Sequence, residues 1–163
     1  MARKEHAPET PATSFLRRHN VTFTGHLYDY VERGGTAESA KQLGVDEHAV
    51  AKTLVMQDEH AKPLLILMHG DRQVSLKTFA RQIGRKKVEP CKPEAAQRHT
   101  GYQVGGTSPF GTRKLLTVYV ERSILRLPAI YINGGHRGFL VRIAPGVLTE
   151  LLQAQPVDCA ATD

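Results

Sequence analysis

Two apolar runs joined by a polar turn constrain the fold of this chain more than any other feature. Residues 54–57 and 64–68 are rich in apolar side chains, and residues 58–63 between them include Asp58 and Pro63, which favour a turn. This arrangement predicts a β-hairpin. The second run is apolar throughout, whereas a half-exposed strand alternates apolar and polar residues, so we predict a central strand covered on both faces.

Short helices and further strands follow one another irregularly along the rest of the chain. Thr10, Thr36 and Ser75 each precede a segment whose first turn their hydroxyls can cap, and Asp46 can start a brief turn. The predicted helices are 11–19, 37–43, 76–83, 93–99 and 145–153, and the predicted strands are 21–28, 51–57, 115–120, 129–133 and 139–143, with a short extended piece from Val88. Because no regular β-α-β alternation occurs, the predicted fold class is α+β, with a mixed β-sheet and surrounding helices.

The size of the chain suits one compact domain. It has 163 residues, of which 40% are hydrophobic, enough to build a single core. We expect residues 1–9 to be a disordered lead-in, residues 10–158 to form the domain and the last few residues to be a tail. No apolar run approaches the roughly 18 residues that a membrane span needs, and the polar N-terminus lacks the apolar segment of a signal peptide, so we expect a soluble, cytoplasmic protein without membrane partners.

The charge of the chain favours an acidic partner. Lysine and arginine number 22 against 16 aspartates and glutamates, which gives a net charge of +6 and a pI near 9.5. Such a balance is typical of proteins that bind nucleic acid, although basic groups at solvated helix ends and turns explain it as well. The basic residues gather at 17–19, at Arg81, at 85–87, at 113–114 and at Arg137.

Two glycine-rich segments are candidates for a binding site. Residues 101–111 hold four glycines beside Thr107, Ser108 and Pro109, and residues 133–138 hold three more. Glycine lets backbone N–H groups approach a ligand closely, and the hydroxyls add hydrogen-bond donors. The first segment lacks both the GxxxxGK[ST] and the GxGxxG pattern, so it is not a phosphate loop. Tight turns are the alternative for both, and the second can also pack against the first.

Lys52 is the most unusual residue of the predicted strands. It stands at the start of the otherwise apolar residues 50–55. Burying an ammonium group among such neighbours is costly, so Lys52 either opens into a cleft, pairs with an anion or extends to the surface.

The sequence gives little support for nucleophilic or metal catalysis. Ser108 is not part of a GxSxG elbow, Cys91 has no activating neighbours, and the HExxH pattern is absent. Cys91 and Cys159 match neither a disulfide framework nor a CxxC site and are expected to be reduced thiols. We therefore predict neither a metal nor an organic cofactor, and an enzyme of this sequence would depend on positioning and electrostatics.

Four segments together resemble a known family. VAKTL at 50–54, KKVE at 86–89, the run AQRHTGYQVGGTSPFG at 96–111 and INGGHRG at 132–138 occur in this order. They resemble the YbaK branch of the superfamily that includes the editing domain of bacterial prolyl-tRNA synthetases. The resemblance covers residues 12–155 and implies an α+β fold with a barrel-like mixed sheet. It also implies a cleft for the aminoacylated 3′ end of tRNA.

The resemblance also implies roles for individual residues. Lys52 would hold the terminal nucleotide or the ester region, and backbone N–H groups at Gly105 and Gly106 would stabilise the oxyanion. The cysteine thiol of the substrate would attack its own ester carbonyl, without a protein general base. Arg137 would contact tRNA phosphates, and the full set of implied substrate-binding residues is Tyr28, Thr53, Thr107, Ser108, Gly134, Gly135 and Arg137.

Two positions depart from the family pattern. Leu140 stands where relatives carry an acidic residue two positions after the second glycine segment, and glycine near Gly35 replaces an aromatic residue. Both changes predict a wider or differently lined pocket. The leading hypothesis is a trans-acting deacylase of Cys-tRNA(Pro), with Cys-tRNA(Cys) as another substrate and docking on prolyl-tRNA synthetase as a further hypothesis. The alternatives are a water-dependent deacylase of another amino acid, such as Ala-tRNA(Pro), and a non-catalytic module that binds RNA or a synthetase.

Overall fold

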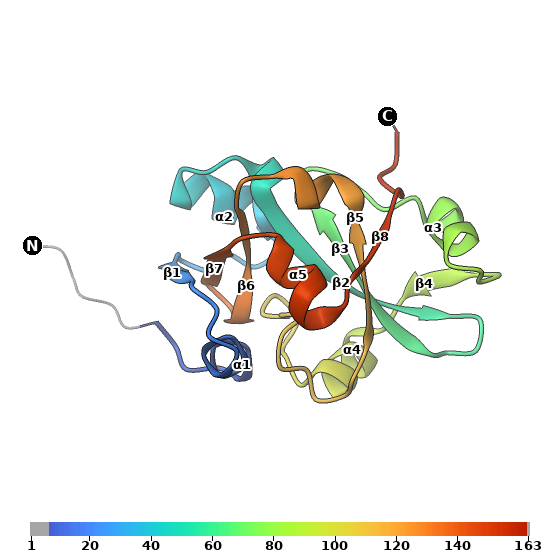
Figure 1. Cartoon of the computed structure of the whole chain (residues 1–163), viewed down its shortest axis with the longest axis horizontal. Coiled ribbons are helices and arrows are strands. Elements are labelled where there is room, and N and C mark those ends of the chain that lie inside the picture. The colour runs from blue at the N-terminus through green and yellow to red at the C-terminus, as the bar shows by residue number, and fades with distance from the viewer. Residues whose placement is uncertain (1–6, 163) are drawn as a thin grey trace, which may run out of the picture.

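The predicted hairpin forms the centre of the protein in the computed structural model, which describes residues 7–162 (Figure 1). Strand β2 (Val50–Asp58) pairs antiparallel with β3 (Pro63–His69), with Thr53 opposite Leu67. Six of the seven β3 residues are buried. The prediction of a central strand covered on both faces is therefore confirmed.

The remaining strands extend this hairpin into one mixed sheet. Its order is β1-β7-β6-β2-β3-β5-β8, and β4 pairs with the far end of β2. The pairs β2–β6, β3–β5 and β5–β8 are parallel and the others are antiparallel. The bounds are β1 Thr24–Leu27, β4 Val88–Pro90, β5 Thr117–Glu121, β6 Ile130–His136, β7 Phe139–Ile143 and β8 Gln155–Val157. A single domain with a mixed sheet and surrounding helices, as predicted, is confirmed.

Five α-helices lie around this sheet in the described part of the chain, and two of them begin with a side-chain cap. Thr10 forms a capping box with Thr13 at the start of α1, and the Ser75 hydroxyl caps α3. None of the helices in residues 7–162 has the length and apolar character that crossing a membrane requires. The bounds are α1 Pro11–Arg18, α2 Gly35–Leu43, α3 Leu76–Gln82, α4 Pro93–Thr100 and α5 Gly146–Leu152, with short 3-10 turns at Glu47–Ala49 (η1) and Arg122–Arg126 (η2).

The predicted capping role of Thr36 is wrong. Helix α2 begins at Gly35, before this residue, and has no side-chain cap. The Thr36 hydroxyl instead lies 2.8 Å from Oε2 of Glu47 and 3.2 Å from the carbonyl oxygen of Gly70, so its one proton has two acceptors within reach. It therefore ties α2 to η1 and to the end of β3.

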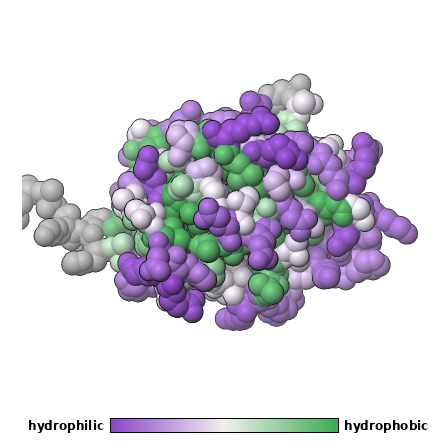
Figure 2. Space-filling model, in the orientation of Figure 1, coloured by the Kyte–Doolittle hydropathy of each residue, from purple (hydrophilic) through white to green (hydrophobic). Residues whose placement is uncertain are grey.

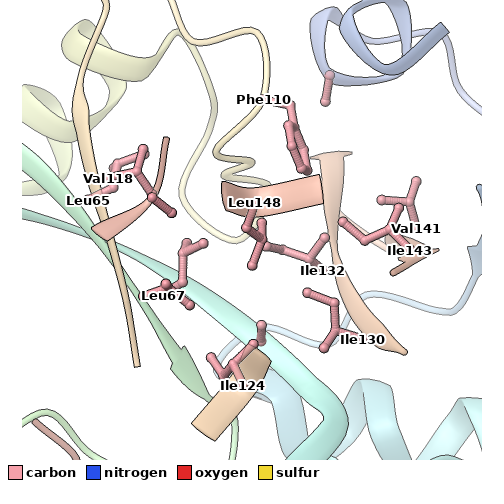
Figure 3. Packing of buried hydrophobic residues seen from close by; sticks show 14 of the residues in the cluster. Leu65, Leu67, Phe110, Val118, Ile124, Ile130, Ile132, Val141, Ile143 and Leu148 are labelled. Atoms are coloured by element: carbon pink, nitrogen blue, oxygen red, sulfur yellow. The ribbon is translucent and has the colours of Figure 1, made fainter. Parts of the chain in front are cut away.

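Alternate residues of β3 supply two apolar clusters, one on each face of the sheet. Leu65 and Leu67 pack with α1 and α5, and Figure 3 shows Leu148 of α5 pointing toward Ile132 of β6. Ile66 and Met68 pack with α3 on the opposite face. This period of two explains why β3 carries no polar residue before His69.

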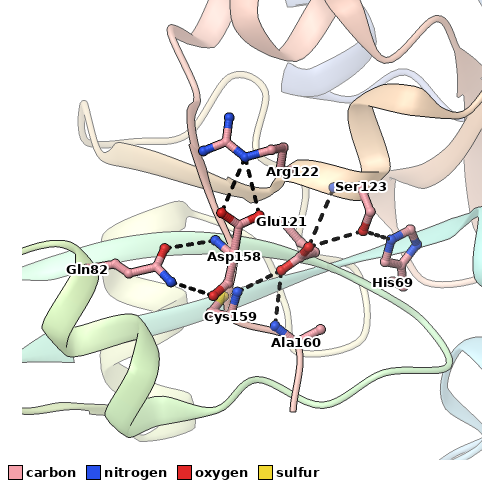
Figure 4. A network of polar contacts seen from close by, with 8 residues as sticks. All are labelled: His69, Gln82, Glu121, Arg122, Ser123, Asp158, Cys159 and Ala160. Atoms are coloured by element: carbon pink, nitrogen blue, oxygen red, sulfur yellow. Dashed lines mark hydrogen bonds and ion pairs between the residues drawn. The ribbon is translucent and has the colours of Figure 1, made fainter. Parts of the chain in front are cut away.

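The chain beyond Asp158, which we predicted to be a tail, is packed against the domain as far as residue 161. Cys159 is buried, and its N–H and that of Ala160 both donate to the buried carboxylate of Glu121, at 2.8 and 3.0 Å (Figure 4). Ser123 links the same carboxylate to His69. The expected lead-in falls mostly on residues 1–6, which lie outside the described part of the chain.

Candidate active site

A cavity of about 570 Å³ opens beside the middle of β2, on the edge that does not pair with β3. Strand β6 pairs only with Val50 and Ala51, and β4 pairs only with the other end of β2, from Met56 onward. The edge of β2 between these two strands faces the cavity. The start of α2, the start of α4 and both glycine segments complete its wall, so segments far apart in the sequence meet at one place.

Lys52 lies in the wall of this cavity and is only partly exposed. Its Nζ donates to the carbonyl oxygen of Gly70 over 3.4 Å. Burial lowers the pKa of Lys52 below its ordinary value of 10.5, and the charges of Glu47 and Asp71 partly offset this shift. Of the three readings left open by the sequence, an opening into a cleft is therefore confirmed. A cation with little competition from protein acceptors is suited to bind an anionic or carbonyl group of a ligand.

Thr53 offers polar groups to the cavity that have no partner in the protein. Its Oγ1 is buried, and no group among residues 7–162 forms a hydrogen bond with it. The carbonyl of Val50 accepts from the N–H of Gly70, so the backbone groups of Val50 point toward β3. Along an antiparallel pair, successive residues point their N–H and C=O alternately toward the partner strand and away from it. The N–H and C=O of Thr53, three residues on, therefore point away from β3. Neither β6 nor β4 pairs there. Buried polar atoms are normally satisfied, so this arrangement indicates a polar ligand.

The two glycine segments are packed against each other at the mouth of the cavity. Asn133 Nδ2 donates to the carbonyl oxygen of Gly105 over 3.1 Å, and Arg137 Nε donates to that of Val104 over 2.8 Å. A Cβ on Gly106 would lie only 2.8 Å from the backbone nitrogen of Arg137. The contact between the segments that we considered from sequence is confirmed, and glycine at position 106 is what permits it.

The predicted site residues divide into two groups. Tyr28, Lys52, Thr53, Gly105, Thr107 and Arg137 line the cavity. Four others lie behind its wall and do not line it: Gly106, Ser108, Gly134 and Gly135.

Packing explains why the second group is displaced from the cavity. The space beside Gly134 holds the ring of Phe139, and its carbonyl accepts from the Thr10 hydroxyl. Gly135 packs in the same way against Tyr102. The N–H of Gly106 already donates to Gln103 over 2.8 Å, so only Gly105 of the predicted oxyanion pair has an N–H without an intramolecular bond in the described chain.

Ser108, a predicted substrate contact, lies inside the protein and does not line the cavity. It is fully buried, and its Oγ accepts from the N–H of Phe110 over 3.1 Å. Replacing Ser108 by alanine is expected to lower the free energy of unfolding by about 1–3 kcal/mol, because a buried N–H loses its acceptor. Chemical denaturation measures this loss. The KM for an aminoacylated substrate should stay within about twofold of wild type, and a large rise in KM at unchanged stability would restore Ser108 to the binding site.

Two contacts hold the guanidinium group of Arg137. Its guanidinium carbon lies 4.8 Å from the centre of the Tyr30 ring, and its Nε is bound to Val104. A cation stacked on a ring and anchored at Nε keeps its outer N–H groups in a fixed direction. Sequence reasoning missed Tyr30 and Asn133 as partners, because only the folded chain brings them beside residues 104–105.

The two family departures both lie in the cavity wall. Gly35 and Leu140 line it, and Leu140 packs with Val50 and Ala40 to form an apolar surface. Cys91 lines the cavity as well, and burial together with the charge of Glu89 raises the pKa of its thiol. A protonated thiol is a weak nucleophile, so this cysteine contributes an apolar wall.

One cluster outside the cavity has side chains of the kind that bind metals. His48, His69 and Asp71 bring their ligand atoms within 4.8 Å of one another. Both ring nitrogens of His69 are already bonded, to the His48 carbonyl and to Ser123, each at 2.7 Å. The two imidazole rings are stacked at 3.7 Å, which does not direct their nitrogens at a common ion. The cluster therefore supports the end of β3 beside Lys52.

Comparison with known proteins identifies the family. The aminoacyl-tRNA editing domain matches residues 32–151, a stretch that contains Lys52 and both glycine segments. The chain belongs to this family. The editing domain is 30% identical over 156 residues to EbsC of Enterococcus faecalis, a protein named as a candidate Cys-tRNA(Pro)/Cys-tRNA(Cys) deacylase, with 95% of each chain covered.

Two further comparisons place the editing domain among its relatives. It is 28% identical over 120 residues to a proline–tRNA ligase of Thermodesulfovibrio yellowstonii, in which the match covers 71% of this chain and 20% of the ligase. A solved structure described as a candidate trans-editing enzyme for prolyl-tRNA synthetase has a TM-score of 0.82 at 23% identity, with 96% and 100% of the two chains covered. The predicted YbaK-type family and its fold are thus confirmed.

Proposed function

We propose that this editing domain is a trans-acting deacylase that removes cysteine from Cys-tRNA(Pro). The observation that supports the proposal is the cavity itself, whose wall contains Lys52, Thr53 with its unpartnered hydroxyl, and Gly105. The relationship to EbsC and to proline–tRNA ligases supports the choice of substrate. Cysteine and proline are of similar size, so a synthetase pocket separates them poorly, and a second site that removes the wrong amino acid restores accuracy.

The chemistry follows from what the cavity wall contains. None of the described histidines lines it, and its cysteine, Cys91, is held as a thiol, so the wall offers neither an imidazole base nor a thiolate nucleophile. We propose that the substrate's own thiol attacks the ester carbonyl carbon. The new C–S bond forms, the bond from that carbon to the ribose oxygen breaks, and the thiol proton is transferred to this oxygen. The products are a cysteine thiolactone and tRNA with a free 3′ end.

The protein would act by positioning and by electrostatics. Lys52 binds the terminal nucleotide or the ester region, and the N–H of Gly105 donates to the oxyanion that forms on the attacked carbonyl. The Thr53 groups accept from, and donate to, the amino acid beside them. This places the reacting thiol near the ester without a covalent enzyme intermediate.

The lining of the cavity favours a second candidate, a water-dependent deacylase of another amino acid. Gly35 and Leu140 stand at the two positions where the family pattern has an aromatic and an acidic residue. The wall has carboxylates at other positions, Glu32 and Glu38, and these could orient water. Alanine bound to tRNA(Pro) is the natural substrate to compare, because it has no thiol.

Three aminoacyl-tRNA(Pro) substrates separate these candidates: cysteinyl, alanyl and 2-aminobutyryl, the last replacing the thiol by a methyl group. Our proposal expects rapid release of cysteine and release of 2-aminobutyrate at least about 100-fold slower, because the intramolecular attack is lost. Comparable release of all three would establish the water-dependent reaction. Binding of these substrates without any release would contradict both and indicate a binding module.

A further inference from the structure

The positive charge of the protein is concentrated in one short segment. Residues 76–92 hold six lysines and arginines and a single acidic residue, a net charge of +5 within a chain whose total is +6. The segment comprises α3, β4 and the loops beside them. The end of the molecule that carries α3 and β4 is largely covered by hydrophilic side chains in Figure 2. This segment is therefore a candidate surface for the acidic partner suggested by the pI.

Five of these basic residues line a groove between α3 and β4, which we call the basic groove: Lys77, Arg81, Arg85, Lys86 and Lys87. Arg85 pairs with Asp58 at 3.0 Å and Lys87 pairs with Glu89 at 3.1 Å. Lys77, Arg81 and Lys86 are exposed and form no ion pair with any described residue. Their charges are therefore available to a ligand.

The basic groove is connected to the active-site cavity by the chain itself. Strand β4 leads from Lys87 to Cys91, which lines the cavity, a distance of about 13 Å for an extended chain of four residues. The exposed Lys92 continues the charge at this junction. Arg137, the residue first considered for phosphate contacts, belongs to the second glycine segment and not to this junction, and its Nε donates to Val104.

We propose that the basic groove binds the phosphate backbone of the tRNA acceptor end as it leaves the cavity. This inference depends on the proposed function for the identity of the RNA. Lys77 and Arg81 are four residues apart on α3, so they lie about 5–6 Å from each other on one helix face, a spacing that suits successive phosphates. Such contacts carry no sequence information but fix the orientation of the RNA.

The test compares two variants with equal net charge. One removes the three unpaired cations of the basic groove (Lys77→Gln, Arg81→Gln and Lys86→Gln). The control removes three exposed cations outside the groove and the cavity wall (Arg18→Gln, Arg126→Gln and Arg142→Gln). Circular dichroism confirms that both are folded. Fluorescence anisotropy then measures binding of a tRNA(Pro) acceptor minihelix that carries no amino acid, at several KCl concentrations. A second assay measures deacylation of cysteinyl-CCA.

The proposal expects the slope of log K against log [KCl] to become shallower by about 2 to 3 units in the groove variant and to change little in the control. Turnover of cysteinyl-CCA, which is too short to reach the groove, should equal that of wild type. The proposal would be overturned if the groove variant bound the minihelix as tightly as the wild-type protein does, or if both variants lost affinity for it equally. A loss confined to binding of polyglutamate would assign the groove to an acidic protein instead.

The failure of this inference can be told apart from a failure of the proposed function. If wild-type protein released no amino acid from any substrate, the deacylase proposal would fail, yet the minihelix would still report on the groove. Conversely, if the groove variant deacylated normally and its RNA binding kept the salt dependence of the wild type, only the assignment of the basic groove as an RNA-binding surface would be refuted.

Discussion

Replacing Lys52 by alanine is expected to reduce kcat/KM for deacylation of Cys-tRNA(Pro) by at least about 100-fold. Lys52 shares the cavity with Thr53 and Gly105, and within residues 7–162 its Nζ has a single hydrogen-bond acceptor, the Gly70 carbonyl at 3.4 Å. A steady-state assay with labelled cysteine measures the effect. The matched control is Lys62→Ala, an exposed lysine on the other end of the hairpin, which should keep wild-type activity.

The same change should not unfold the protein. Burial lowers the pKa of Lys52 in the folded state because the charged ammonium loses part of its hydration, and this desolvation opposes folding. Between the folded pKa and the ordinary value of 10.5 the unfolded chain binds more protons, so this cost declines as pH rises. Lys52→Met, which keeps the aliphatic stem, should have a Tm at or above that of wild type. Activity near wild type in either variant would refute the assigned role.

Replacing Gly106 by alanine is expected to separate the two glycine segments. The added Cβ would lie 2.8 Å from the Arg137 nitrogen and 3.0 Å from the His136 carbonyl carbon, and backbone atoms cannot move aside as a flexible side chain can. We expect a loss of about 1–3 kcal/mol in the free energy of unfolding. We also expect a roughly 100-fold loss of kcat/KM, because Gly105 next to it would be displaced by a fraction of an ångström to an ångström.

A second glycine provides the control for this prediction. Gly146 begins α5, and its nearest neighbour to an added Cβ is 3.9 Å away. Gly146→Ala is therefore expected to be neutral or to stabilise the protein by up to about 1 kcal/mol. Equal effects of the two substitutions on stability and activity would show that contact between the glycine segments does not matter.

Sequence patterns predicted most of the secondary structure because most elements carry their own signals. Capping residues marked α1 and α3, and apolar residues marked β2 and β3. Strand β8 was missed because Gln155–Val157 has only three residues, one of them proline, and becomes a strand only by pairing with β5. Cys159 was assigned to a tail for the same reason, since the buried Glu121 that holds it is distant in the sequence.

The candidate site was predicted in part, and the division has a physical cause. Lys52 stood out because an ammonium group in an apolar strand is costly, which is a local property. Whether a glycine lines a cavity or supports it depends on what occupies the space beside its Cα. Phe139 fills that space at Gly134, whereas Gly105 lines the cavity. Both glycines belong to a Gly-Gly pair, so the sequence alone does not distinguish them.

The hydrogen bond from the Thr10 hydroxyl to the Gly134 carbonyl has a consequence for the order of folding. It joins residues that are 124 positions apart, and the N-terminal helix that Thr10 caps also packs against Gly111. During synthesis, helix α1 must wait until residue 134 has been made before this partner exists. Closing so long a loop is slow, so competence for catalysis should emerge late in refolding, after the local helices have formed.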